Sequence, residues 1–510
     1  MEMQNFAPIM FGGLVAVMII GFPVAFSLAA LGLGCGFFAI QMGWFPAAFM
    51  SNLPISIFSI LSNDLLLAIP FFTFMGTILE KCGLAEDMLD SMGQLFGPVR
   101  GGLGYSVIIV GFILGAITGT VAGQVIAMAL ISLPVMIRYG YNMRYATGVL
   151  AASGTITQLV PPSLVLVVLA DQLGKPVGDM YKGAWGPSLL QIAMFALYTY
   201  GLGLVKPEYI PGVPKEARTL QGWALWSKCL KGIIPSAILI FTVLGSMGGL
   251  PFQSSALATP TEAGAMGVVG ALILAGMHKR LSKELLWEAM HGTMRLTAMV
   301  VFILIGSRVF SQVFQGVDGS KWVEHLLTGL PGGQVGFLIV VNVFVFFLAF
   351  FLDFFEIAFI IVPMLTPVAQ KLGIDLVWFG VLLCVNLQTS FMHPPFGFAL
   401  FYLRGIADTL FKDKRIPEAI KSNDIYLGSI PWVIMQILLV IIVIFFPQSV
   451  TAFLDKEEVV DLDKVVIEMP QDEDADKAAA QAAEDLLKTP QQNQQSAEDE
   501  QKKIDDLFKK

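Results

Sequence analysis

Residues 153–163 read SGTITQLVPPS and lie inside the apolar segment 143–171, which is long enough to cross a membrane. Because Pro161 and Pro162 carry no backbone N–H group and Gly154 adds backbone freedom, no continuous helix is expected through this stretch. A break at membrane depth leaves carbonyl and N–H groups without helical partners. This is tolerated where the backbone is buried in protein or lines a cavity. The stretch therefore predicts a discontinuous membrane helix with a function at its break.

The composition of the whole chain agrees with a membrane location. Of the 510 residues, 55% are hydrophobic and only 14% are charged, and the mean hydropathy is +0.73. Apolar runs of spanning length recur up to about residue 447, which predicts an all-α polytopic membrane protein. The start of the chain carries no Lys or Arg, so residues 8–22 are expected to stay as a first membrane helix rather than to be removed as a signal peptide.

The sequence offers no motif for a cofactor. It contains no CxxC, HExxH, GxGxxG or Walker-type loop, and its four cysteines have no pairable spacing. We therefore expect no cofactor and no ATP site. A membrane-embedded enzyme is a further possibility. The membrane segments of this sequence contain no nucleophile–base pair and no metal-ligand cluster, so we expect no enzymatic activity. The expected surroundings are the lipid bilayer and small molecules, without nucleic acid.

A second break of the same kind follows in the other half of the chain. When Pro161 is aligned with Pro394, residues 116–163 align with 349–396 without a gap, and every proline of the first window meets a proline of the second. The stretch SGTITQLVPPS then has a partner, NLQTSFMHPPF at 386–396. This shared register predicts two structural repeats, each with a discontinuous helix.

Each half also contains a segment that is too long for one crossing, at 103–136 and at 334–370. Small or polar residues in the middle of both predict re-entrant helical hairpins whose tips stop at membrane depth. If each hairpin returns to its own side, the first half crosses an odd number of times, so the second repeat is inverted. Lys and Arg gather in the loops of one side, which predicts that the N-terminus and the acidic tail lie on the outer side of the membrane.

The predicted domain organisation follows from these repeats. The first membrane repeat covers 1–205, with its broken helix at 143–171, and a cytoplasmic linker covers 206–231. The second, inverted repeat covers 232–447, with its broken helix at 376–406. The remaining residues, 448–510, are rich in Asp, Glu, Gln, Lys and Ala, which predicts an acidic and largely disordered tail.

Local patterns predict further elements. The apolar run 187–205 predicts a spanning helix that starts at Pro187. The stretches 83–99 and 319–330 are amphipathic and are expected to lie at the membrane interface. Thr259 is followed by Pro260 and, three residues on, by Glu262, which predicts a capping box with proline at the first helical position.

Inverted repeats with hairpins and broken helices are typical of secondary transporters. Free carbonyls and hydroxyls at the breaks suit a hard cation such as Na⁺, and half-helix N-termini suit carboxylates. Asp353 is a carboxylate inside a membrane segment, which marks it as a functional candidate. An alternative is that the hydroxyls only satisfy helix backbone or join helices.

Thr157 and Ser390 occupy equivalent positions of the two repeats. The expected Na⁺ ligands are backbone and side-chain oxygens of Ser153, Thr157, Asn386 and Ser390. The full set of predicted ion- or substrate-binding residues lies at the breaks and hairpin tips: Thr118, Gly119, Thr120, Ser153, Gly154, Thr157, Pro161, Asp353, Asn386, Ser390 and Pro394.

Four motifs carry a resemblance to a known family. GFPVAF at 21–26, the stretch 153–163, ATPTEA at 258–263 and NLQTSFMHPPFG at 386–397 occur in the order found in the large membrane (permease) subunit, of DctM type, of tripartite ATP-independent periplasmic (TRAP) transporters. The resemblance covers residues 8–447. It implies an elevator-type ion-transporter fold and import of an organic acid with Na⁺ across the bacterial inner membrane. It also implies two partners, a periplasmic solute-binding protein and a small four-helix membrane subunit.

This chain departs from the family pattern at several positions. The family usually has Gly where this chain has Thr157 and Ser390, and Thr where it has His393. Asp353 matches an Asp that is common in the family's second hairpin. The first hairpin of the family usually carries Ser-Gly-Ser-Ser followed by an Asp. At these positions this chain has Thr118, Gly119, Thr120, Val121 and Gln124.

A second interpretation of the transport function remains open. The same fold would serve a stand-alone elevator symporter for a dicarboxylate, coupled to Na⁺ or to H⁺ and working without partners. His393 at the second break would be the candidate for proton coupling, since histidine titrates near neutrality.

Overall fold

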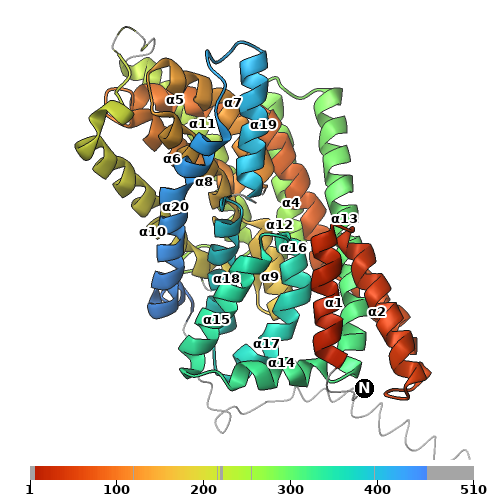
Figure 1. Cartoon of the computed structure of the whole chain (residues 1–510). Helices are drawn as coiled ribbons and strands as arrows, with labels where there is room; N and C mark the ends of the chain where they lie inside the picture. The colour runs from red at the N-terminus through yellow and green to blue at the C-terminus, as the bar shows by residue number, and fades with distance from the viewer. Residues whose placement is uncertain are drawn as a thin grey trace, which may run out of the picture. The chain divides into compact units, whose positions relative to one another are not determined.

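Apolar helices follow one another from Phe6 to Phe445 in the computed structural model of the chain (Figure 1). The structure describes residues 6–455 except 119, 215, 217, 219–221, 254, 395 and 396. Residues Met1–Asp455 form one unit. The described residues end at Asp455, so most of the expected acidic tail lies outside them. Among the described residues, eight helices are long and apolar enough to cross a membrane, or up to ten if each bent pair counts as one span. The protein is therefore a multi-span membrane protein.

The first half contains both short and spanning helices. Its elements are α1 (Phe6–Ile20), α2 (Val24–Gln41), a 3-10 helix (Ala47–Asn52), α3 (Leu53–Leu61), α4 (Asp64–Lys81), α5 (Leu84–Leu95), α6 (Gly102–Thr118), α7 (Val121–Arg138), α8 (Met143–Thr155), a 3-10 turn (Ile156–Gln158), α9 (Leu164–Leu173) and α10 (Val177–Val205). Capping residues define several of these starts. Asn63 Oδ1 accepts from Leu65 N at 3.0 Å, and Asn142 Oδ1 accepts from Arg144 N at 3.0 Å.

The second half follows the same plan. Its elements are α11 (Gly222–Ser246), α12 (Pro260–Met277), α13 (Lys283–Gly316), α14 (Gly319–Thr328), α15 (Gly333–Leu348), α16 (Phe354–Glu356), a π-helical turn (Ile357–Ile361), α17 (Val362–Lys371), α18 (Leu376–Ser390), α19 (Phe398–Lys412), α20 (Ser422–Phe445) and α21 (Gln448–Thr451). The predicted capping box is confirmed. Thr259 Oγ1 accepts from Glu262 N at 3.3 Å, Glu262 Oε2 accepts from Thr259 N at 2.8 Å, and Pro260 is the first helical residue.

The two hairpins enter from opposite ends of the molecule. Figure 1 shows α6 and α7 in the upper part, and α15 and α17 in the lower part. The first broken helix runs from α8 above to α9 below, whereas the second runs from α18 below to α19 above. The predicted fold class is therefore confirmed: the chain is all-α and polytopic, and each inverted repeat has one hairpin and one discontinuous helix.

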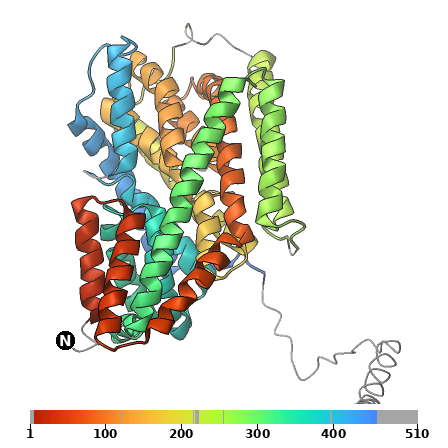
Figure 2. The same cartoon turned by 90° about the vertical axis from the view of Figure 1, so that its right-hand side faces the viewer.

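The broken helices lie at the centre, and long helices flank them. Helix α20 packs on α8 and α18, and α18 packs on α9. At one side α13 crosses beside α2 and α4 (Figure 2). A Cβ placed on Gly32 of α2 would lie 2.9 Å from Phe310 N of α13, so only glycine permits this close approach.

Some boundaries differ from the sequence prediction. Helix α10 begins at Val177, whereas the apolar pattern predicted a start at Pro187, because Asp179 and Lys182 interrupt that pattern. Helix α3, bent by 45° from α4, was not predicted, since nine residues are too few for a spanning signal. Helix α11 begins at Gly222, inside the range 206–231 that was predicted to be a linker.

Candidate functional site at the two helix breaks

The first break consists of the residues between α8 and α9. The 3-10 turn follows Thr155, the Pro161–Pro162 peptide bond is cis, and Ser163 Oγ accepts from Val165 N at 3.2 Å where α9 begins. The side chains of Ser153 and Thr157 have no exposed surface. The break is thus enclosed by protein, as backbone without helical partners requires at this depth.

The first hairpin holds this break through hydrogen bonds. Thr157 Oγ1 donates to the carbonyl oxygen of Gly115 on α6 at 2.8 Å. Gln124 Nε2 on α7 donates to the carbonyl oxygens of Gly111 at 2.6 Å and of Ser153 at 2.8 Å. The sequence also marks Gln124 as a polar side chain at the tip of the first hairpin, but Gln124 is not in the set of predicted site residues. A buried amide at the position of a family carboxylate was the available signal.

Glycine permits close packing in this seam. A Cβ on Gly154 would lie 2.1 Å from Val125 Cγ2 on α7, so no larger side chain fits there. A Cβ on Gly115 would lie 3.1 Å from Thr157 Cα. Gly154 therefore allows the broken helix to contact the hairpin closely, in addition to giving the helix backbone more freedom.

The second break consists of the residues between α18 and α19. Ser390 Oγ donates to the Leu387 carbonyl oxygen at 2.5 Å, so its proton is used within its own helix. Asn386 Nδ2 donates to the Asn342 carbonyl oxygen on α15 at 2.8 Å. Pro394 is half-buried, whereas Pro395 and Phe396 lie outside the described residues. A side-chain amide therefore joins hairpin and broken helix in this half as well.

The structure brings the two breaks together. Cys384 Sγ on α18 donates to the carbonyl oxygen of Gln158 in the first break at 3.1 Å. Gln436 Nε2 on α20 donates to Thr155 Oγ1 at 3.0 Å. Residues from the two halves of the sequence therefore share one buried region.

The hairpin tips differ from each other. At the second tip Asp353 Oδ1 accepts from Phe354 N at 2.6 Å, and Glu356 Oε2 accepts from Asp353 N at 2.9 Å, so these two carboxylates form a capping box. At the first tip Thr120 precedes α7 and makes no capping bond through its side chain. Gly119 and the side chain of Thr118 lie outside the described part of the chain.

Several buried oxygens near the breaks have no hydrogen-bond donor within the described residues. They are Ser153 Oγ, Gln158 Oε1, Asn342 Oδ1 and Gln436 Oε1. A buried oxygen without a donor costs free energy, and a cation or ordered water satisfies it. This region therefore contains several buried oxygens whose lone pairs are available to an ordered water or a cation.

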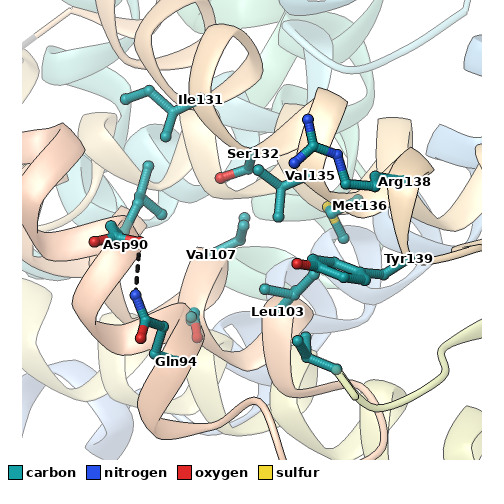
Figure 3. Close-up of a pocket in the computed structure, with 14 residues that line it drawn as sticks. Asp90, Gln94, Leu103, Val107, Ile131, Ser132, Val135, Met136, Arg138 and Tyr139 are labelled. Atoms are coloured by element: carbon teal, nitrogen blue, oxygen red, sulfur yellow. Dashed lines mark hydrogen bonds between the residues drawn. The ribbon is translucent and has the colours of Figure 1, made fainter. Parts of the chain in front are cut away.

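A separate pocket of about 240 Å³ lies away from the breaks, where α5 meets the base of the first hairpin (Figure 3). Leu103 and Ser132 line it from the hairpin, and Asp90 lines it from α5. Asp90 accepts from Gln94 Nε2 at 3.0 Å and from Lys228 Nζ at 2.5 Å. None of the residues predicted for the ion or substrate site lines this pocket.

Spanning helices, inverted hairpins and buried helix breaks together are typical of polytopic membrane transporters. Comparison with known proteins gives the family. Residues 11–449 match the family described as "Tripartite ATP-independent periplasmic transporter, DctM component", and the chain belongs to this family. The resemblance found in the four motifs is thereby confirmed, as is the expectation of a transport protein rather than an enzyme.

Two of the relatives are large permease proteins that the chain matches over most of their length. The chain is 26% identical to the C4-dicarboxylate TRAP transporter large permease protein DctM of Vibrio cholerae, over 85% of this chain and 94% of that protein. It is 25% identical to the 2,3-diketo-L-gulonate TRAP transporter large permease protein YiaN of Escherichia coli, over 87% and 97%. The fold is similar to that of the Alcanivorax borkumensis YdaH transporter, with a TM-score of 0.50 and 16% identity over 81% of this chain and 88% of that chain.

Proposed function

We propose that this permease subunit imports an organic acid across the bacterial inner membrane together with Na⁺. The family assignment supports a transport role, and the names of the relatives point to the substrate class. C4-dicarboxylates and 2,3-diketo-L-gulonate are both carboxylates. A further relative, from Oleidesulfovibrio alaskensis, is an isethionate TRAP transporter permease protein, so the chemistry shared by these substrates is a small organic anion.

The observation that carries Na⁺ coupling is the set of buried oxygens without donors at the breaks. Carbonyl, amide and hydroxyl oxygens suit a hard cation, and a hydroxyl that donates its proton to a carbonyl keeps lone pairs for a metal ion. We propose that Na⁺ binds at one or both breaks. Ser153 and Thr157 are the candidate ligands in the first half, and Asn386 and Ser390 in the second.

The proposed partners are a periplasmic solute-binding protein, which would deliver the organic acid, and a small four-helix membrane subunit. The family description, a tripartite periplasmic transporter, supports both. In this arrangement the N-terminus and the tail after Asp455 face the periplasm. The proposed motion is an elevator, in which each hairpin and its broken helix move together against a frame that includes α1, α2, α4 and α13. The hydrogen bonds from Gln124 and Asn386 support these pairings.

Uptake into proteoliposomes tests the proposal. The chain is reconstituted with both partners and a labelled C4-dicarboxylate or isethionate is offered, with and without an inward Na⁺ gradient. Uptake is expected only with Na⁺ and with both partners, and ATP should have no effect. Comparable saturable uptake by the chain alone would favour the stand-alone symporter. Full uptake driven by a proton gradient without Na⁺ would overturn Na⁺ coupling and favour a proton site at His393.

A further inference from the structure

The Gln124 side chain occupies an unusual place for an amide. It has no exposed surface, and its Nε2 lies between carbonyl oxygens of two different elements, 2.6 Å from Gly111 O on α6 and 2.8 Å from Ser153 O on α8. Both N–H groups of the amide can therefore be used at once. The side chain starts on α7, so it joins both helices of the hairpin to the broken helix.

Two buried carbonyl oxygens that converge on one point are the arrangement that a small cation also satisfies. Here the point is taken by an N–H₂ group, which carries partial positive charge and is covalently attached to the chain. The neighbouring hydroxyl is also engaged, since Thr157 Oγ1 donates to Gly115 O at 2.8 Å. Three carbonyl oxygens between hairpin and broken helix, those of Gly111, Gly115 and Ser153, are thus already bound by protein donors.

The second half is built differently. The position that aligns with Gln124 in the repeat is Ile357, which supplies no donor. The amide there belongs to Asn386 on the broken helix and donates to Asn342 O, while Asn342 Oδ1 stays buried without a donor among the described residues. This half also carries the carboxylate of Asp353 at its hairpin tip. At the equivalent position it therefore lacks the N–H₂ donor that Gln124 supplies in the first half.

We propose that the Gln124 amide is a built-in substitute for a cation in the first half, so this half closes hairpin on broken helix without Na⁺. The inference rests on the proposed Na⁺ coupling and narrows it: the Na⁺ requirement resides in the second half, at Asn386 and Ser390. Gln124 acts as a positioning residue that holds Ser153 and Gly111 together.

The substitution Gln124→Glu tests this directly. It replaces the two N–H donors by a carboxylate of the same size, so the same two carbonyls now converge with a negative charge and need a cation. The purified variant should unfold at a lower temperature than the wild type in choline chloride and should regain stability in NaCl. KCl should restore less. The matched control is Gln191→Glu, the same change at a buried amide that pairs with Gln388 outside the hairpin seam. It should lose stability without selective rescue by Na⁺.

A second arm uses variants with small changes, in case Gln124→Glu does not fold. Ser153→Ala should leave the Na⁺ concentration for half-maximal stabilisation within about twofold of wild type, whereas Asn386→Ala should raise it about tenfold or more. Equal effects of the two alanine variants would overturn the inference. A Gln124→Glu protein no more sensitive to Na⁺ than Gln191→Glu would also overturn it. Failure of the proposed function would give a different result, since uptake by the wild type would then not depend on Na⁺.

Discussion

Gln191 on α10 and Gln388 on α18 exchange two hydrogen bonds, from Gln191 Nε2 to Gln388 Oε1 at 3.0 Å and from Gln388 Nε2 to Gln191 Oε1 at 3.1 Å. Both side chains are buried. Each amide therefore supplies the partner that the other needs in an apolar interior. The pair fixes the second broken helix to the long helix that follows the first.

Substituting one member of this pair should cost more than substituting both. In Gln388→Leu the Gln191 amide stays buried without its partner, at a cost of about 1–3 kcal/mol in the free energy of unfolding. The double variant Gln191→Leu/Gln388→Leu leaves no unpaired amide and should recover part of this loss. Thermal unfolding of the four proteins, measured as a double-mutant cycle, checks this. Additive losses would show that the two amides act independently.

Gly154→Ala should separate the first broken helix from the hairpin. The new Cβ would lie 2.1 Å from Val125 Cγ2, so helix α7 must shift, at a cost of about 1–3 kcal/mol. The control is Gly201→Ala on α10, where no atom lies within 4 Å of the new Cβ and the loss of backbone freedom should stabilise slightly. Unfolding temperatures in detergent distinguish the two. Equal stability of both variants would contradict the tight seam.

Asp353→Asn should separate the structural role of this carboxylate from its role in ion binding. Asparagine caps helices as well as aspartate does, so the bond from Phe354 N and the fold should persist. If the negative charge serves Na⁺, the Na⁺ concentration for half-maximal uptake should rise about tenfold or more. Uptake is measured over a range of Na⁺ at constant ionic strength. An unchanged Na⁺ requirement would leave Asp353 with capping alone.

The residues after the last spanning helix should be needed for stability up to Asp455. Val450 is fully buried, and the ammonium group of Lys182, a residue with 3% of its surface exposed, pairs with Asp455 at 2.8 Å. A chain that stops after Pro447 loses both the Asp455 carboxylate and the buried contacts of Val450 with α10, which should cost about 3 kcal/mol. A chain that stops after Asp455 should unfold at the temperature of the full-length protein. Equal stability of both truncations would show that this pair contributes nothing.

A cross-link between the frame and the second hairpin should stop transport reversibly. Phe11 on α1 and Ile361 both line two adjacent apolar grooves between α1 and this hairpin. With the native cysteines replaced, the pair Phe11→Cys/Ile361→Cys should block uptake on cross-linking and regain it on reduction. The control pair, Gly36→Cys/Val313→Cys, joins α2 to α13 inside the frame, where a Cβ on Gly36 would lie 3.0 Å from Val313 Cγ2. Full uptake with the first pair cross-linked would exclude the elevator motion.

The backbone features of this fold could be predicted because they depend on local chemistry. Proline pairs remove hydrogen-bond donors, so the breaks at Pro161 and Pro394 were visible in the sequence, and their shared register disclosed the repeat. The capping box at Thr259 depends on three neighbouring residues and was equally visible. The predicted start of helix α10 was too late because Lys182, a charged residue, is typical of a loop. Its partner Asp455 is apparent only in the structure.

The side-chain pairs of the site could not be predicted in the same way. Gln124 meets Ser153 and Gln191 meets Gln388 only after helices from distant parts of the chain are packed together. A single glutamine in an apolar segment gives no sign of which carbonyl or amide it will meet. The sequence placed the hydroxyls at the breaks. It did not show that Ser390 would bond within its own helix while Thr157 bonds to the hairpin.

The glycines of α6 limit how the first repeat can deform. A Cβ on Gly111 would lie 2.8 Å from Ser153 Cβ, so the two helices are separated there by little more than a hydrogen atom. If α6 slid along α8 by one turn, Val107 would take the place of Gly111 and its side chain would collide with Ser153. Sliding by one turn is therefore blocked in the direction that brings Val107 to Ser153. A displacement of the hairpin in that direction has to carry α8 with it, and the relative motion has to occur elsewhere, at faces where side chains already separate the helices.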